Sequence, residues 1–173
     1  MIIGICGKSG SGKSTYANKI IRIFDNRPVY VDIDKIGHDS LKEDDVKSSI
    51  VRQFGEELLD NNEINRKKLS DIVFNSKEEM EKLTQITWKY MENIIDRIIE
   101  ENKGRIILLD WQLLPKTKFF DMCDLKILLD IPYEVRKQRI LKRDNISEEK
   151  FDLREKASYN YDNDKFDIVI ESN

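Results

Sequence analysis

The sequence predicts an α/β fold in which a doubly wound parallel sheet of five strands carries a helical insert and a lid. Short apolar runs alternate with stretches of helical spacing, which is typical of parallel sheets covered by helices on both faces. A charged region without strand-like runs interrupts this alternation. We therefore expect one domain, with a core at residues 1–36 and 103–173, an insert at about 37–102 and a lid at about 144–165.

The first part of the core is expected to hold two strands and one helix. The apolar run Met1–Cys6 precedes a glycine, as a buried strand before a sharp turn does. Apolar residues then recur at helical spacing over Ser14–Phe24, and Asn26 and Pro28 end that helix. The run Val29–Ile33 predicts the second strand.

The insert is expected to be helical throughout. Apolar residues at helical spacing indicate helices around residues 46–54, 69–73 and 83–99, and the last of these ends near Gly104.

The core resumes after the insert with continuous apolar runs. These runs predict strands at Arg105–Trp111 and Leu125–Ile131, followed by a helix from Glu134 to about Arg143. Residues 144–165 are charged, contain few large apolar side chains and suit a mobile lid. Asp167–Ile170 predicts the last strand.

Composition excludes several classes of protein. Lys and Arg number 30 against 33 Asp and Glu, so the balance lacks the basic excess typical of nucleic-acid binding. No apolar run approaches the roughly 20 residues of a membrane helix, and no basic segment precedes the N-terminal apolar run as in a signal peptide. Cys6 and Cys123 lie in strand-like runs, so we expect buried free thiols and a cytoplasmic protein.

Residues 7–14 match G-x-x-x-x-G-K-[ST], the phosphate-binding loop of nucleotide-binding proteins. Its glycines let backbone N–H groups face the phosphates, and the loop leads into a helix N-terminus that favours anions. Lys13 is expected to reach the β- and γ-phosphates, and the Ser14 hydroxyl to contact Mg²⁺. The predicted ATP-binding residues are Gly10, Ser11, Gly12, Lys13, Ser14 and Thr15.

Asp32 and Asp34 close the second strand, where ligands of open α/β sheets bind. A carboxylate there can accept a proton from a hydroxyl that attacks the γ-phosphate, and we assign this role to Asp32. The alternative is a pair of solvated turn residues, and Asp34 fits a helix cap better. His38, the single histidine, is expected at the surface or in packing.

Asp110 closes the run Ile106–Leu109, the pattern of a carboxylate that helps to hold Mg²⁺. Asp130 matches the same pattern, but Asp110 is preferred beside a phosphate loop. Among the cations of residues 136–143, Arg139 is the candidate to stabilise the transferring phosphoryl group. The other cations of this segment fit an ordinary charged helix face.

The loop alone leaves kinases, GTPases, ATPases and nucleotide-binding regulators. We find no N-K-x-D element at a suitable place for a GTPase, and the chain is short for a motor or transporter ATPase. A small-molecule kinase fits the length, the helical insert and the late arginines.

The sequence resembles the dephospho-coenzyme A kinase family along nearly its whole length. The resemblance rests on GKSGSGKST, VDIDKIGH, the stretch FGEELLDNNEINRKKLSDIVF with its Val73–Phe74 pair, DWQLL, the lid segment from Ile131 to Asp144, and FDIVIESN.

This resemblance implies a P-loop kinase fold with a five-stranded parallel sheet, a helical coenzyme A region and a lid. It implies transfer of the γ-phosphate of ATP, with Mg²⁺, to the ribose 3′-hydroxyl of dephospho-coenzyme A, with Asp32 as the base. Arg66 would then contact substrate phosphate, although by itself it reads as a charged residue at a helix start.

The chain departs from the family pattern at several positions. Gln112 stands in place of a proline, Lys116 near a common glutamate, and Arg136 in place of the lid glutamine. Thr87-Trp88 replaces a His-Pro pair, and the sequence stops at Asn173, before an expected final helix. We therefore keep two alternatives: a kinase for another small hydroxyl acceptor such as a nucleoside, and a nucleotide-binding regulator without catalysis. The sequence leaves the oligomeric state open.

Overall fold

The chain folds into two units. The structure is a computed structural model that describes residues 1–25, 27–73 and 76–171. One unit, called the sheet unit, comprises Met1–Asp32 and Asn102–Asn173, and the other, the helical unit, comprises Ile33–Glu101. Asn26, Phe74 and the end of the FDIVIESN segment, used above, lie outside the described residues.

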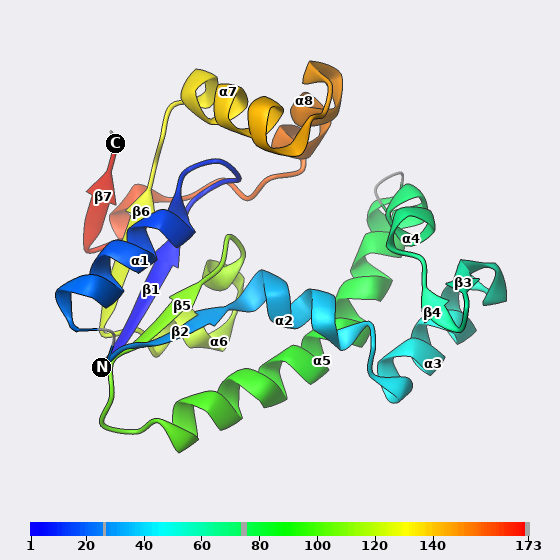
Figure 1. The fold of residues 1–173 in the computed structure, drawn as a ribbon, viewed down its shortest axis with the longest axis horizontal. Coiled ribbons are helices and arrows are strands. Elements are labelled where there is room, and N and C mark those ends of the chain that lie inside the picture. Colours follow the sequence, from blue (N-terminus) through cyan, green and yellow to red (C-terminus); the bar gives the residue numbers. More distant parts are fainter. Residues whose placement is uncertain (26, 74–75, 172–173) are drawn as a thin grey trace. The chain divides into compact units, whose positions relative to one another are not determined.

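The sheet unit contains the five-stranded parallel sheet that the sequence predicts (Figure 1). Its strands lie in the order β2-β5-β1-β6-β7, so the first strand of the chain is the central one. Because both neighbours of β1 come much later in the sequence, the chain must cross over between them. The strands are β1 (Ile2–Cys6), β2 (Val29–Asp32), β5 (Ile107–Asp110), β6 (Leu125–Leu129) and β7 (Ile168–Ile170).

Side chains alternate between the two faces of β1. Ile3 and Ile5 pack in one buried cluster with Ala17 of helix α1 (Lys13–Ile23). On the other face, a Cβ at Gly4 would lie 2.9 Å from both Leu114 Cδ2 and Cys123 Sγ. The short helices η2 (Leu114–Lys116) and α6 (Lys118–Asp121) flank this second contact.

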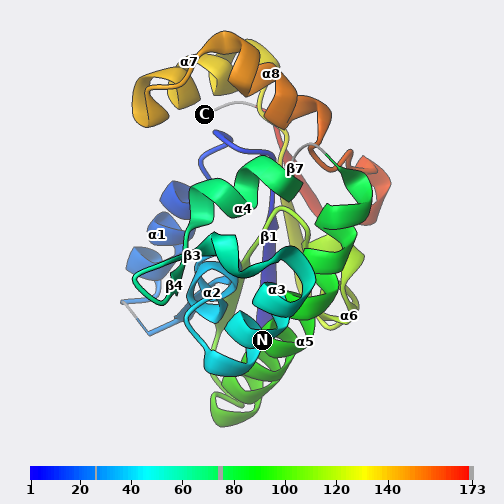
Figure 2. The same ribbon diagram turned by 90° about the vertical axis from the view of Figure 1, so that its right-hand side faces the viewer.

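Two helices follow β6, where the sequence predicts one helix and a lid. Helix α7 spans Tyr133–Asp144 and helix α8 spans Glu148–Lys156, as Figure 2 shows. The Ser147 side chain accepts a hydrogen bond from the backbone N–H of Lys150 and so caps α8. Phe151 is 1% exposed and packs against the Tyr133 ring at a centroid distance of 5.4 Å. The short helix η3 (Asn163–Lys165) precedes β7.

The helical unit has an apolar core of its own. Its helices are α2 (Ile33–Ser40), α3 (Asp44–Phe54), η1 (Glu56–Leu58), α4 (Arg66–Val73) and α5 (Lys77–Glu101). The buried residues of this core are Val46, Ile50, Phe54, Leu58, Ile64, Leu69 and Val73.

One strand pair corrects the expectation of a purely helical insert. β3 (Leu59–Asp60) and β4 (Glu63–Ile64) form an antiparallel hairpin. Asn61 and Asn62 connect them with φ values of 50° and 65°, a combination typical of a tight two-residue hairpin turn. Strands of two residues are too short to show an alternating pattern, so periodicity could not reveal them.

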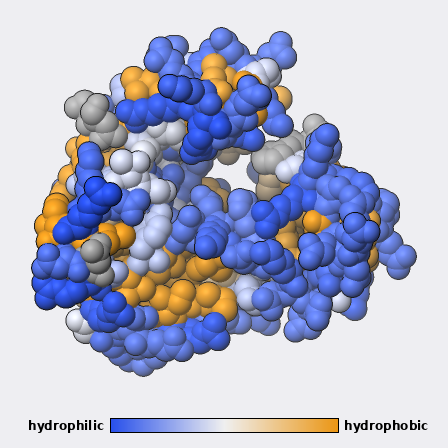
Figure 3. All heavy atoms as spheres, in the orientation of Figure 1, coloured by the Kyte–Doolittle hydropathy of each residue, from blue (hydrophilic) through white to orange (hydrophobic). Residues whose placement is uncertain are grey.

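The surface agrees with the high share of charged residues. Hydrophilic side chains predominate on the face seen in Figure 3. None of the helices in the described part of the chain has the length and apolar character needed to cross a membrane. Cys6 and Cys123 are buried free thiols, as predicted.

Candidate active site

The phosphate loop connects β1 to α1 through residues 7–12, and two glycines shape it. Gly12 caps α1 with φ 89°, and Gly10 has φ 81°, conformations that L side chains rarely adopt. Gly10 also lies against α7, because a Cβ there would sit 2.8 Å from the Arg136 carbonyl oxygen and 3.0 Å from Ile140 Cγ1. The loop therefore needs glycine at position 10 both for its conformation and for its contact with α7.

Lys13, the first residue of α1, turns its side chain back over the loop. Its Nζ donates a hydrogen bond of 3.0 Å to the carbonyl oxygen of Gly7. The ammonium therefore lies beside the loop at the positive end of α1, where both charge and helix dipole favour anionic ligands.

Ser14, Tyr30 and Asp110 meet on one carboxylate oxygen. The Ser14 hydroxyl donates to Asp110 Oδ2 at 3.1 Å, and the Tyr30 hydroxyl donates to the same oxygen at 2.7 Å. The structure thus places the predicted pair Ser14 and Asp110 together. Asp130, the other aspartate with the same pattern, is exposed and accepts a hydrogen bond from Asn163.

Burial sets the protonation properties of this cluster. Asp110 is 4% exposed, and burial raises the pKa of its carboxyl, against the opposing effects of Lys13 and of the hydrogen bonds from Tyr30 and Ser14. Burial also raises the pKa of the Tyr30 phenol, so Tyr30 stays a hydrogen-bond donor at neutral pH. A cation beside Asp110 would offset the cost of keeping this carboxylate ionised.

Oxygen ligands of the kind that Mg²⁺ prefers are present at this position. Mg²⁺ in such sites is held by one or two carboxylates together with substrate phosphates, not by a cage of protein ligands. The described residues contain no group of three or more His, Cys, Asp or Glu side chains arranged to hold a metal. The Ser14 hydroxyl beside the Asp110 carboxylate fits a site in which Mg²⁺ is held by a few protein oxygens together with substrate phosphates.

Asp32 lies next to Asp110 at the ends of neighbouring strands. The two residues are paired in the register of β2 and β5, so their side chains leave the same edge of the sheet on the same face. Asp32 is half-buried, whereas Asp34 is exposed in the first turn of α2. The sheet therefore sets two carboxylates side by side near the phosphate loop.

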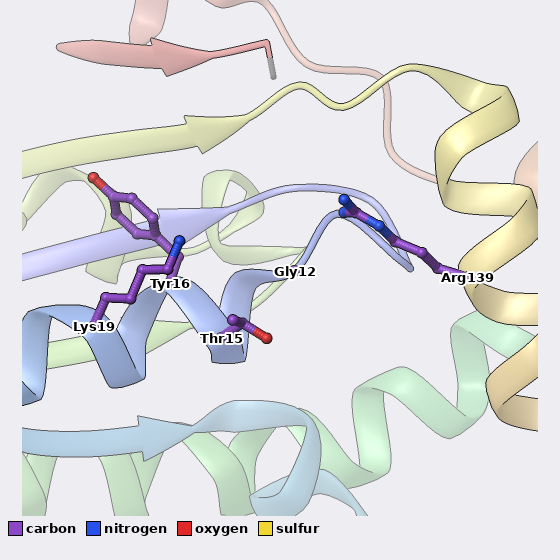
Figure 4. Close-up of a pocket in the computed structure, with 5 residues that line it drawn as sticks. All are labelled: Gly12, Thr15, Tyr16, Lys19 and Arg139. Carbon is purple, nitrogen blue, oxygen red and sulfur yellow. The ribbon is translucent and has the colours of Figure 1, made fainter. Parts of the chain in front are cut away.

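Arg139 reaches from α7 toward the phosphate loop. Its Nη1 lies 3.4 Å from the Gly10 carbonyl oxygen. Together with Gly12 and three residues of α1, it lines a pocket at the loop (Figure 4). The three α1 residues are Thr15, Tyr16 and Lys19. The structure thus brings Arg139 to the loop, and its role beside the phosphoryl groups stays a prediction.

Arg66 belongs to the helical unit, where it begins α4. Its Nη2 donates to the His38 carbonyl oxygen at 3.1 Å, and it lines a pocket together with Lys42 and Lys47. Asn65 caps the same helix by accepting from the backbone N–H groups of Lys67 and Lys68. Contact of Arg66 with a substrate phosphate stays a prediction. His38 is exposed.

Two further residues contact the phosphate loop although the sequence did not predict them there. Arg136, expected on a solvated helix face, is 5% exposed and ion-paired with Glu155. The Tyr161 hydroxyl accepts from the Gly7 backbone N–H and donates to the Gln112 carbonyl oxygen. Both depend on contacts between distant segments, which a single sequence does not display. Only the arginine-rich character of α7 signalled that this region was involved.

A parallel five-stranded sheet whose central strand leads into a glycine-rich phosphate loop defines a P-loop nucleotide-binding fold. The family model for dephospho-CoA kinase matches residues 1–171. The chain therefore belongs to the dephospho-CoA kinase family.

Curated relatives of the chain carry the same family name. The dephospho-CoA kinase of Fusobacterium nucleatum is 35% identical over 180 residues, which cover 100% of this chain and 90% of the relative. That of Aquifex aeolicus is 36% identical over 156 residues, covering 88% and 77%.

Solved structures share the fold at lower identity. The crystal structure of TT1252 from Thermus thermophilus matches with a TM-score of 0.82 and 22% identity, covering 100% of this chain and 88% of that one. Dephospho-CoA kinase from Campylobacter jejuni matches with a TM-score of 0.60 and 24% identity, covering 99% and 87%.

Proposed function

We propose that this chain transfers the γ-phosphate of ATP to the ribose 3′-hydroxyl of dephospho-coenzyme A, the last step of coenzyme A biosynthesis. The observation that carries the proposal is the family match over residues 1–171, which includes the phosphate loop and both strand-end aspartates. Two buried free thiols fit a reducing compartment, and we place the enzyme in the cytoplasm.

The loop residues are proposed to hold ATP. Backbone N–H groups of the loop and of the first turn of α1 surround the phosphates, and Lys13 adds a point charge beside them. The residues in this role are Gly10, Ser11, Gly12, Lys13, Ser14 and Thr15. Arg139 of α7, which lines the pocket at the loop, would stabilise the negative charge that develops on the transferring group.

Ser14 and Asp110 would hold Mg²⁺. When bound, Mg²⁺ neutralises charge on the phosphates of ATP. Within the protein, Tyr30 fixes the orientation of the Asp110 carboxylate through the 2.7 Å hydrogen bond. This partner is of the kind that outer-shell groups provide at metal sites.

Asp32 would act as the base. Its carboxylate accepts the proton of the acceptor hydroxyl as that oxygen attacks phosphorus, a role worth roughly 10²- to 10⁴-fold in rate. Its place beside Asp110, across neighbouring strands, keeps the base close to the proposed metal ligand. Arg66, in the helical unit, would bind a phosphate of the acceptor.

The direct test is ADP release with Mg-ATP in the presence and absence of dephospho-coenzyme A. We expect the acceptor to raise turnover far above the ATP-only background. The same assay with nucleosides and other small alcohols separates this function from that of a kinase for another acceptor. Turnover on none of the acceptors, with ATP still bound, would contradict the proposal and favour a nucleotide-binding regulator.

A further inference from the structure

The carboxylate of Glu155 on α8 joins two cations that come from distant parts of the chain. Its oxygens form a bidentate ion pair with Arg136 of α7, at 2.7 Å from Nη1 and 2.9 Å from Nη2. Oε1 also lies 2.9 Å from the Nζ of Lys8 in the phosphate loop. One side chain of α8 therefore contacts both the loop and the helix that carries Arg139.

These three side chains are shielded from water. The exposed fractions are 5% for Arg136, 17% for Glu155 and 23% for Lys8. Arg136 makes further hydrogen bonds to the carbonyl oxygens of Ile131, at 2.8 Å, and Ser9, at 3.4 Å. A shielded and bidentate pair is screened less by salt than a surface pair and holds a more defined geometry.

The charge of Glu155 is permanent under ordinary conditions. The hydrogen bonds from Arg136, and then those from Lys8, lower the pKa of its carboxyl to about 2. Two cations and one anion leave a net positive charge at this corner of the loop. Removal of the anion alone would make the corner more positive, and charge by itself would then favour ATP more strongly.

The geometry of the loop instead predicts that loss of the Glu155 charge weakens ATP binding. Gly10 lies against the backbone of Arg136, and Arg139, one helical turn further along α7, lies 3.4 Å from the Gly10 carbonyl oxygen. The placement of α7 on the loop therefore determines where the Arg139 guanidinium lies. Glu155 contributes to that placement, because it contacts Arg136 of α7 and Lys8 of the loop at the same time.

We propose that Glu155 is a positioning residue for ATP binding, which acts through Lys8 and Arg136 on the shape of the phosphate loop and the location of Arg139. The proposal rests on the proposed kinase function for its meaning, but it concerns the binding of ATP before any acceptor is present. It assigns to α8 a part in the nucleotide site, although α8 itself carries none of the residues proposed to touch the phosphates.

The test measures the dissociation constant for Mg-ATP by calorimetric titration, without acceptor, for the wild type and Glu155→Gln. We expect Glu155→Gln to weaken ATP binding by about tenfold, in the range of coupling found for mutations in contact networks. Glu155→Asp, which keeps the charge on a shorter side chain, should recover part of the loss. Binding by Glu155→Gln as tight as or tighter than the wild type would overturn the proposal.

Glu148→Gln is the matched control. Glu148 also lies on α8 and pairs with Lys137 of α7 at 2.6 Å, but its side chain is 68% exposed and this pair does not involve the loop. We expect it to change the dissociation constant less than about twofold, as is common for exposed pairs. An equal loss in both variants would show that general α7–α8 stability, and not Glu155, determines ATP binding.

A second pair of variants keeps the question answerable if Glu155→Gln folds poorly. Lys8→Met leaves the Arg136–Glu155 pair in place, and its effect on ATP binding should shrink when Glu155 is already changed. Additive effects of Lys8→Met and Glu155→Asp would overturn the proposal. Failure of the acceptor assay would contradict the proposed function but would leave these binding results unaffected, so the two failures are distinguishable.

Discussion

The hydroxyl of Tyr30 lies 2.7 Å from Asp110 Oδ2 and donates the shorter of two hydrogen bonds to that oxygen. Tyr30 is two residues before Asp32 on β2, so one strand carries both the proposed base and the residue that orients the proposed metal ligand. A phenol whose pKa is raised by burial remains a donor throughout the neutral range.

Tyr30→Phe removes this hydrogen bond and keeps the ring. We expect the Mg²⁺ concentration needed for half-maximal activity to rise by about tenfold, because outer-shell partners commonly contribute 10- to 100-fold to metal affinity. Initial rates measured against free Mg²⁺ at saturating ATP check this. Tyr133→Phe makes the same chemical change at a hydroxyl bonded to Asp152 and should leave the requirement unchanged. An unaltered Mg²⁺ curve for Tyr30→Phe would remove Tyr30 from the site.

Asp32→Asn keeps the size of the side chain but abolishes its basicity. Turnover should fall by about 10²- to 10⁴-fold while the dissociation constant for ATP stays within about twofold. Single-turnover kinetics together with ATP titration separate the two quantities. Asp34→Asn, an exposed neighbour in the first turn of α2, is the control and should keep its turnover. Near-normal turnover of Asp32→Asn would reject Asp32 as the base.

Arg139→Ala removes the guanidinium from the loop pocket. We expect kcat to fall by at least about 100-fold, as for other groups that stabilise developing phosphoryl charge. Arg139→Lys should recover only part of the rate, because an ammonium lacks the planar set of donors. Lys142→Ala, an exposed change on the same helix, serves as the control. Equal steady-state rates for Arg139→Ala and Lys142→Ala would contradict the role.

Tyr161→Phe breaks a bridge between the loop and the segment after β5. The hydroxyl accepts from Gly7 N–H at 3.1 Å and donates to the Gln112 carbonyl oxygen at 2.8 Å. Loss of both bonds should lower the free energy of unfolding by about 1–3 kcal/mol, measured by urea denaturation. Tyr159→Phe is the control, because it removes a hydroxyl from the neighbouring tyrosine, whose ring packs edge-on against Tyr161. Equal midpoints for the wild type and Tyr161→Phe would show that the bridge contributes nothing.

The low pKa of Glu155 predicts a dependence of stability on pH. The carboxyl titrates at about 2 in the folded chain and near its ordinary value of 4.5 when unfolded. Its stabilising effect is therefore complete above about pH 5 and is lost as the pH falls from 4.5 toward 2. The difference in unfolding free energy between the wild type and Glu155→Gln should shrink over this window. A difference that stays constant from pH 7 to pH 3 would contradict the shifted pKa.

Local sequence features predicted much of the sheet unit. The apolar runs identified all five strands, and the glycine motif located the phosphate loop between β1 and α1. Strand ends predicted that Asp32 and Asp110 each lie at the edge of the sheet where ligands bind, whereas their pairing across β2 and β5 is seen only in the structure. These features depend on short stretches of chain whose pattern is visible without knowledge of distant contacts.

Helix α8 shows where periodicity stopped being informative. Its apolar residues Phe151 and Leu153 are two apart and do not form a helical stripe, yet Phe151 is fully buried. The helix is marked instead by the Ser147 cap, by acidic residues in the first turn and by basic residues in the last. Capping signals could have found this helix, whereas its Glu155 contacts depend on how distant segments pack.

The register of β2 against β5 determines both the burial of Val31 and the position of Asp32 beside Asp110. Val31, which is 3% exposed, pairs with Leu109 in the same ladder that pairs Asp32 with Asp110. A slip of one residue would turn Val31 outward and point Asp32 to the opposite face. The packing of β2 therefore also sets the spacing between two acidic groups. A change in the packing of Val31 would therefore be expected to move the carboxylate of Asp32 as well.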